Sequence, residues 1–283
     1  MRLGGRRASD NVDDRRGKGM GKAPLGIGGM IIVGLIVWVM GGNPLDVVTQ
    51  QLANAPTTET DYTPSAEEEQ AATFAKTVLA GTEDIWTELF AQNGLKYKAP
   101  RMVLFTNATQ SGCGNASAST GPFYCPADQT LYIDLSFFQE METQLNAGGD
   151  FAYAYVIAHE VGHHVQYLLG TLDKVHQQQQ RLSQKEANKL NVRLELQADF
   201  YAGVWAHHDN KNFRSLEDGD IEEGLNAASQ IGDDRLQMKA QGYTVPDSFN
   251  HGTSAQRNRW LKKGLETGDM TAGNTFSVSD SQL

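Results

Sequence analysis

Two histidines and a glutamate in the pattern H-E-x-x-H carry the most specific chemistry of this chain. They are His159, Glu160 and His163, and the apolar stretch around them, residues 152–169, predicts a buried helix. Histidines four residues apart project from one helical face, so both imidazoles can bind a single zinc ion. Glu160 would then lie beside the open position of the metal, where a carboxylate can take a proton from a water that attacks a carbonyl. The pattern therefore predicts peptide hydrolysis.

The alternative to a metal site is a surface helix that carries histidines by coincidence, because the five-residue pattern also arises by chance. The neighbours argue against this alternative, since Tyr155, Ile157 and Val165 belong to a surface that is apolar nearly all round the helix. Two histidines and a glutamate buried there would cost free energy without a metal partner. A structural zinc site has four protein ligands, whereas a catalytic site keeps three and leaves a position for water. A third ligand is therefore expected.

Glu195 and Asp199 are the candidates that complete the site. They lie four residues apart on a second apolar helix, so one helical face offers two carboxylates. Glu195 can ligate the zinc, while Asp199 can accept the outward N–H of a ligating histidine. The alternative, a solvated acidic pair, fits poorly between apolar neighbours. The metzincin arrangement is excluded, because it needs Gly and His where Gln166 and Leu169 stand.

This combination resembles the gluzincins, and residues 64–268 resemble the bacterial family of neutral zinc metallopeptidases. The resemblance rests on four separated blocks: residues 123–134, the zinc helix, residues 195–199 and residues 251–257. It implies a zincin-like catalytic domain of the α+β class, mainly helical with a small sheet. It also implies Zn²⁺ as the cofactor and a protein or peptide as the substrate.

The block at residues 251–257 is similar to the His-Pro-x-x-x-x-Arg element of membrane-bound gluzincins of the heat-shock and CAAX-processing kinds, with Gly252 in place of the proline. The resemblance implies that His251 points toward the site and donates a hydrogen bond to the oxyanion of the tetrahedral intermediate. It implies a nearby structural or charge-stabilising role for Arg257. Without the resemblance, His251 would be interpreted as a loop residue ahead of a helix. The remaining histidines lack the spacing and are interpreted as non-ligands: His164, His176, His207 and His208.

An uncharged segment near the amino terminus predicts a membrane anchor. Residues 23–42 contain no charged side chain, and about 20 helical residues match the hydrocarbon thickness of a bilayer. Residues 1–22 hold seven Lys and Arg against three Asp. This balance predicts a cytoplasmic amino terminus and a single-pass protein of the cell membrane, whose catalytic domain lies outside, as in the periplasm. The alternative is a cleaved signal peptide, but residues 41–45 supply no small-residue cleavage site.

The chain has two cysteines, Cys113 and Cys125, which lie 12 residues apart in a stretch rich in Gly, Ser and Asn. On an exported domain this arrangement favours a disulfide. The alternatives are two metal ligands or two unpaired thiols, although the spacing matches no zinc motif. A disulfide would agree with the export that the anchor predicts.

The elements that would position the site are predicted from periodicity and from turn residues. Residues 43–63 have no sustained periodicity and are interpreted as a linker. Residues 65–68 resemble a capping box, and the helix that follows has Gly81 as a candidate break. Strands are predicted at residues 101–105 and 130–135, and the second is interpreted as an edge strand that binds an extended substrate.

Further helices are predicted at residues 183–207, 218–231 and 254–266, and residues 269–283 are predicted to be a disordered tail. The first 22 residues carry a net charge of +4 in a chain of −10, so the rest carries −14, which argues against nucleic-acid binding. We interpret the chain as a membrane-anchored zinc endopeptidase. One alternative is a catalytically silent zinc protein that binds envelope partners or assists assembly, and another is a hydrolase of cell-wall crosslinks.

Overall fold

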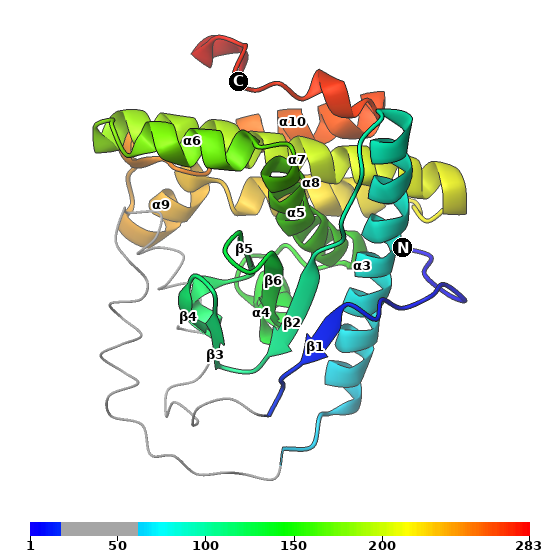
Figure 1. The fold of residues 1–283 in the computed structure, drawn as a ribbon. Helices are drawn as coiled ribbons and strands as arrows, with labels where there is room; N and C mark the ends of the chain where they lie inside the picture. The colour runs from blue at the N-terminus through cyan, green and yellow to red at the C-terminus, as the bar shows by residue number, and fades with distance from the viewer. Residues whose placement is uncertain (18–61) are drawn as a thin grey trace.

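The computed structural model describes residues 1–17 and 62–283, in which a four-stranded sheet lies beside a larger set of helices (Figure 1). The strand order is β1-β2-β6-β5; β1, β2 and β6 run parallel, and β5 is antiparallel to β6. A separate hairpin pairs β3 with β4. The strands are β1 Val12–Asp14, β2 Arg101–Phe105, β3 Ala108–Ser111, β4 Gly114–Ser117, β5 Phe123–Cys125 and β6 Thr130–Asp134.

Helices form most of the described chain, which confirms the prediction of a mainly helical α+β fold with a small sheet. The two longest, α3 and α7, run along different sides of α5, the helix that carries the H-E-x-x-H pattern (Figure 1). The helices are α3 Ala66–Gln92, α4 Ser136–Thr143, α5 Asp150–Leu168, α6 Thr171–Gln179, α7 Gln184–Phe213, α8 Asp220–Gln230, α9 Asp233–Gln241 and α10 Ser254–Thr267.

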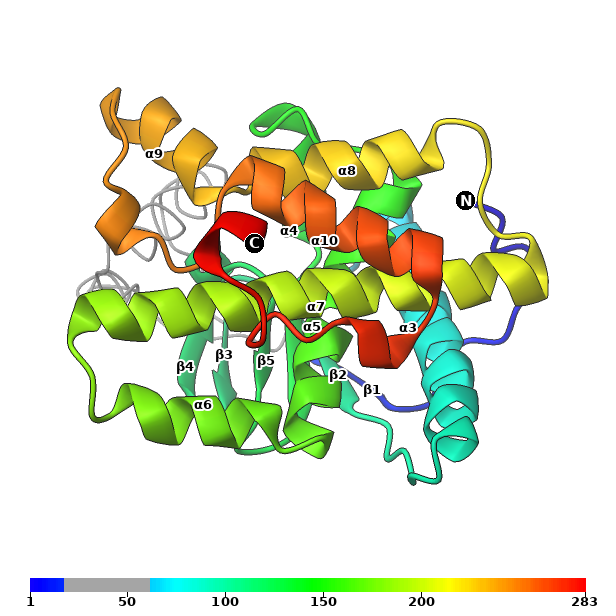
Figure 2. The same ribbon diagram turned by 90° about the horizontal axis from the view of Figure 1, so that it is seen from above.

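Close packing of α10 on α7 places residues from the end of the chain next to the middle of α7 (Figure 2). A Cβ atom added to Gly203 would lie 2.2 Å from the carbonyl oxygen of Leu261, and one added to Gly264 would lie 2.1 Å from that of Phe200. The two backbones therefore touch at a contact that only glycine permits. This contact fixes the distance at which α10 presents side chains to α7.

Helix α3 begins with the predicted capping box, since Ser65 accepts the backbone N–H of Glu68 and the Glu68 side chain accepts that of Ser65. The predicted break at Gly81 is wrong, because α3 continues through it to Gln92. A Cβ atom at this position would lie 2.6 Å from the Arg6 guanidinium. Gly81 therefore makes room for a residue from the amino terminus.

Residues 1–17, which we call the N-terminal arm, pack onto the domain. Strand β1 of the arm pairs with β2 and so forms one edge of the sheet. Arg6 donates to both carboxylate oxygens of the buried Asp209 at 2.9 and 2.6 Å. Arg7 pairs with Asp84 on α3 at 2.6 Å. The basic side chains of the arm thus bind acidic side chains of the domain.

This packing contradicts the prediction that residues 1–22 stay in the cytoplasm while the domain lies outside. A single crossing of the bilayer between the arm and the domain would separate two segments that the structure holds in one sheet. The count of basic residues misled the prediction, because these arginines have carboxylate partners within the protein. The predicted anchor, residues 23–42, and the predicted linker up to residue 61 lie outside the described residues. Within 1–17 and 62–283, no helix has the length and apolar character needed to cross a bilayer.

The predicted disorder of residues 269–283 also disagrees with the structure, where this segment lies against α7 and α10 (Figure 2). Gln197 donates its side-chain N–H to the carbonyl of Gly273 at 2.9 Å, and Trp260 donates to that of Leu283 at 3.2 Å. Arg193 donates to the carbonyl of Val278 at 2.9 Å. The order comes from side chains of two helices that bind the backbone of the tail, which its own composition does not indicate.

Candidate metal centre

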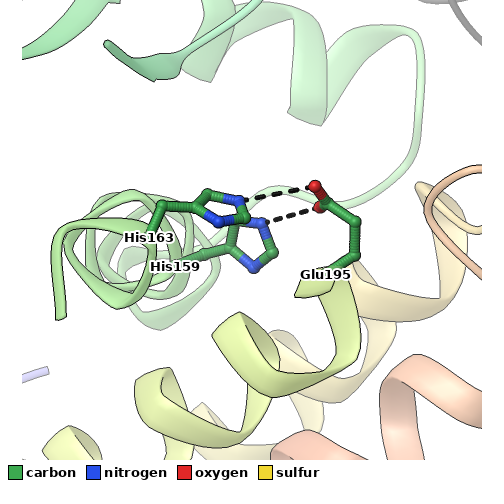
Figure 3. Close-up of side chains that lie close together, drawn as sticks. All are labelled: His159, His163 and Glu195. Carbon is green, nitrogen blue, oxygen red and sulfur yellow. Dashed lines mark hydrogen bonds and ion pairs between the residues drawn. The ribbon is translucent and has the colours of Figure 1, made fainter. Parts of the chain in front are cut away.

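The three predicted zinc ligands converge between α5 and α7 (Figure 3). His159 and His163 project from one face of α5, and Glu195 faces them from α7. Nε2 of His159 lies 3.2 Å from one carboxylate oxygen of Glu195, and Nε2 of His163 lies 3.5 Å from the other. The three ligand atoms all lie within 4.8 Å of one another. The structure therefore brings together the ligand set that the sequence predicts.

The outward ring nitrogens of both histidines are held by acceptors. Nδ1 of His159 lies 2.8 Å from Oδ1 of Asp199, and Nδ1 of His163 lies 2.9 Å from Oε1 of Gln166. The Gln166 amide is oriented because its nitrogen donates to the carbonyl of Leu194 at 2.8 Å. These acceptors place the ring proton on Nδ1 and leave the lone pair of Nε2 directed into the site. This tautomer is the one that binds a metal ion.

Two imidazole nitrogens and one carboxylate fit Zn²⁺, which in catalytic sites takes three protein ligands and keeps a fourth position for water or substrate. Burial lowers the pKa of His159, but Asp199 and Glu195 outweigh burial and raise the pKa to about 10. Burial raises the pKa of Glu195, yet His163 and His159 bring it well below its usual range. The carboxylates thus attract positive charge to this buried position, as a cation site requires.

Asp199 connects the ligand His159 to helix α10. Nε and Nη2 of Arg257 each lie 2.9 Å from the Asp199 carboxylate, and the hydroxyl of Tyr155 donates to Oδ1 at 2.5 Å. Burial raises the pKa of Asp199, but Arg257 and His159 bring it below its usual value. Arg257 is 3% exposed, so the Asp199 carboxylate is needed to compensate its buried positive charge. Sequence reasoning placed Asp199 and Arg257 near the site but treated Tyr155 only as an apolar core residue.

Glu160 lines the cavity that contains the three ligands. Glu160 is 8% exposed, and its burial raises the pKa of the carboxyl. The nearby His159 and His163 lower this pKa. The backbone N–H of Tyr124 in β5 also favours the ionised carboxylate. A carboxyl with a raised pKa at a cavity wall can both accept a proton and return it.

His251 also lines this cavity, and Asp233 holds it there. The ring Nδ1 of His251 lies 3.1 Å from one carboxylate oxygen of Asp233. The other oxygen accepts the backbone N–H groups of Asn250, His251 and Gly252 at 2.8, 2.7 and 2.9 Å. Gly252 has a φ of 94°, which proline cannot adopt, so the departure from His-Pro has a backbone cause. Sequence reasoning missed Asp233, which lies 18 residues before His251 and belongs to no motif.

The cavity has a volume of about 250 Å³ and combines the polar site with an apolar wall. His176, predicted to be an exposed non-ligand, contributes to its lining because α6 packs beside α7. Asn191 of α7 lines it as well, and no sequence signal marked this residue. The apolar wall offers a binding surface for a substrate side chain. Its side chains include Phe123, Phe137, Val156, Leu172 and Leu236.

Strand β5, rather than β6, is the edge strand beside the cavity. The prediction that residues 130–135 form this edge is wrong, because β6 lies between β2 and β5. Phe123 and Tyr124 of β5 line the cavity. The predicted disulfide forms between Cys113 and Cys125, with an S–S distance of 2.00 Å, and it ties β5 to the β3–β4 hairpin. The short strand escaped prediction because three residues give no measurable alternation.

The other histidines do not reach the three ligands. His164 is fully buried, and burial lowers the pKa of its ring to about 4. His207 and His208 lie 2.8 Å from the carbonyl oxygens of Leu265 and Gly268, respectively. Within the described residues, the group that could hold a metal ion is the one formed by the two motif histidines and the α7 glutamate.

Comparison with known proteins places this site in a family. A family model described as "Putative neutral zinc metallopeptidase" matches residues 1–276. The Escherichia coli K12 protein YpfJ is 50% identical over 289 residues, which cover 99% of this chain and 100% of YpfJ. A protein of Mycobacterium tuberculosis H37Rv is 45% identical over 194 residues, which cover 65% of this chain and 64% of that protein. No solved structure matches the chain. The chain therefore belongs to the neutral zinc metallopeptidase family.

Proposed function

We propose that this protein is a zinc-dependent endopeptidase in which Glu160 is the general base. The observation that carries the proposal is the buried Glu160 carboxyl at the wall of a cavity that also contains a three-ligand zinc site. Zinc held by His159, His163 and Glu195 would supply Lewis acidity that activates water and polarises the scissile carbonyl. A purely structural site would have no use for an additional carboxyl that is not a ligand and lies beside the cavity.

The side chains of the site then have separate tasks. Glu160 accepts a proton from the attacking water and returns it to the leaving amine. Asp199 keeps the His159 ring in the tautomer that binds zinc, and Arg257 holds Asp199 in place. His251, oriented by Asp233, stabilises the negative charge that develops on the carbonyl oxygen.

An extended peptide fits the edge of the sheet beside this cavity. Among the residues that the structure describes, no strand pairs with the outer side of β5, so its backbone can pair with a substrate segment. Main-chain pairing tolerates many sequences, whereas the apolar cavity wall favours a hydrophobic side chain at one subsite. The proposed substrate is therefore an unfolded or extended polypeptide with a hydrophobic residue near the cleaved bond.

Attachment to a membrane through residues 23–42 remains part of the proposal, on the grounds of their uncharged sequence. The arm and the domain would lie on the same side of that membrane, because they share one sheet, so the attachment proposed here is not the single crossing that the sequence predicts. The disulfide favours an oxidising compartment, such as the periplasm. The test places a cysteine at the exposed Ala8 or at the exposed Gln92 and labels intact cells with a membrane-impermeant maleimide. Labelling of both positions supports this topology, and labelling of Gln92→Cys alone contradicts it.

The function is tested with purified full-length protein, its Glu160→Gln variant and, as a matched control, Glu222→Gln at an exposed position of α8. Zinc content and hydrolysis of casein are measured for all three. We expect one equivalent of zinc in each protein and loss of activity by several orders of magnitude in Glu160→Gln alone. Undiminished turnover by a zinc-loaded Glu160→Gln protein contradicts the role of Glu160. Zinc in all three without hydrolysis favours the silent zinc-binding protein.

A further inference from the structure

The hydrogen bonds of His164 have a direction that its surroundings determine. Its Nε2 lies 2.6 Å from the backbone carbonyl oxygen of Lys98, and this oxygen can only accept a hydrogen bond. The Nε2 atom therefore carries the proton of the neutral ring. Nδ1 is then an acceptor, and it lies 2.9 Å from the hydroxyl of Tyr124. It follows that the Tyr124 hydroxyl donates a hydrogen bond to Nδ1 of His164.

This bond joins helix α5 to the strand that borders the cavity. Tyr124 is the central residue of β5, and it lines the cavity. Its backbone N–H forms a hydrogen bond with the Glu160 side chain. Pro122 and Pro126 flank β5 and have no N–H, so neither can replace this donor. The position of one residue, Tyr124, therefore affects both the cavity wall and the general base.

Two side-chain attachments hold β5, the short edge strand, in place. The disulfide from Cys125 ties β5 to the β3–β4 hairpin, which lies away from the helices. The bond from Tyr124 to His164 ties β5 directly to α5, the helix that carries Glu160. A three-residue edge strand has few backbone bonds of its own, so a buried side-chain bond contributes much of its order.

We propose that His164 is a positioning residue, which through the hydroxyl of Tyr124 holds β5 against α5 and so keeps the Tyr124 N–H next to Glu160. This inference rests on the proposed hydrolase function for its effect on turnover. Its structural part, the order of β5, is independent of that function. A histidine that only filled space in the core would leave the order of β5 unchanged when the Tyr124 hydroxyl is removed.

The decisive variant is Tyr124→Phe, which keeps the ring at the cavity wall and removes the hydroxyl alone. The matched control is Tyr167→Phe, since the Tyr167 hydroxyl accepts a hydrogen bond from Gln129 at 3.2 Å and this tyrosine does not belong to β5. Amide hydrogen exchange of residues 123–125 is followed in both variants and in the parent protein, all as full-length chains. Exchange should become about tenfold faster in Tyr124→Phe and stay unchanged in Tyr167→Phe.

Activity gives a second readout with the same proteins. In Tyr124→Phe, kcat for casein should fall about tenfold while KM and zinc content stay within about twofold of the parent values. His164→Asn should retain more activity than His164→Leu, because the asparagine carboxamide can still bond the Tyr124 hydroxyl. Imidazole ¹⁵N shifts of the parent protein should report the Nε2–H tautomer of His164 without any substitution.

The outcomes separate this inference from the proposed function. If the parent protein hydrolyses casein but Tyr124→Phe matches Tyr167→Phe in both exchange and kcat, the positioning role is overturned and the function stands. If the parent protein hydrolyses nothing, the function fails, yet faster exchange in Tyr124→Phe alone still supports the attachment of β5. An Nδ1–H tautomer of His164 overturns the inference whatever the activity.

Discussion

Oδ1 of Asp199 lies 2.8 Å from Nδ1 of His159, on the side of the ring that faces away from Glu195. The same carboxylate accepts hydrogen bonds from two nitrogens of Arg257 and from the hydroxyl of Tyr155. One buried carboxylate thus has two roles, since it orients a histidine of the proposed zinc site and neutralises a buried arginine. Changes at Asp199 should therefore affect metal affinity and stability together.

Replacement of Asp199 by Asn tests this double role. An Asn can present an N–H to His159, which favours the ring tautomer with a proton on Nε2, and it leaves the Arg257 charge without its partner. Zinc affinity should fall about 10- to 100-fold, and the free energy of unfolding should fall by about 3–5 kcal/mol. Competition with a chromophoric chelator and urea unfolding measure the two effects. Asp218→Asn, at an exposed position, is the control, and equal zinc affinity in both variants would contradict the orienting role.

Zinc removal should destabilise the whole domain, because the three ligands lie on two packed helices. Binding to the native state alone stabilises it by about 4 kcal/mol at a free zinc concentration of 1,000 times Kd. For a domain of this size that corresponds to a rise in Tm of about 10 °C. Scanning calorimetry of chelator-treated protein, with and without added zinc, measures the difference. A Tm that zinc does not change in the parent protein would argue against a native-state site.

Features encoded within a few residues could be predicted from the sequence. The two histidines of the proposed zinc site lie four residues apart, and Ser65 and Glu68 of the capping box lie three residues apart, so helical geometry alone relates each pair. Glu195 and Asp199 were recognised for the same reason, as a pair on one helix. The proposed ligand set was predictable because each of its two parts, the histidine pair and the acidic pair, lies within one turn of a single helix.

Features that depend on contacts between distant segments could not be predicted. Asp233 holds the ring of His251, and Gln166 contacts His163 with an orientation set by the carbonyl of Leu194, which is 28 residues away. The arginines of the N-terminal arm predicted a cytoplasmic amino terminus, whereas in the structure they bind carboxylates of the domain such as Asp209. Charge counts and periodicity do not contain information about such partners.

The arm should contribute measurably to stability through Arg6. This side chain is 12% exposed, and its partner Asp209 is fully buried. Arg6→Met leaves a buried carboxylate without its cation, so the free energy of unfolding should fall by about 3–5 kcal/mol. Arg2→Met is the matched control, because Arg2 is 66% exposed and its solvent-exposed pair with Glu217 should contribute little to stability. Equal urea midpoints for the two variants would show that the arm does not depend on the buried pair.

Glu140 on α4 should make stability depend on pH. Its residue is 5% exposed, and neither carboxyl oxygen has a hydrogen-bond partner among the described residues. Burial, together with the charge of Asp134, raises the pKa of this carboxyl to about 8 from the ordinary value of 4.5. Between these two values the unfolded chain has released the proton while the native protein keeps it. Stability from this group is therefore complete below pH 4.5 and is lost as the pH rises toward 8.

Glu140→Gln removes this dependence, because the amide stays neutral at every pH. The variant should match the parent protein near pH 4.5 and exceed it at pH 8, by up to a few kcal/mol of unfolding free energy. Urea unfolding of both proteins at pH 5 and pH 8 measures the difference. Glu142→Gln is the control, since Glu142 is exposed in the same helix. Its replacement should change the free energy of unfolding equally at pH 5 and at pH 8. If the advantage of Glu140→Gln is the same at pH 5 and pH 8, the Glu140 carboxyl ionises in the native protein as readily as in the unfolded chain.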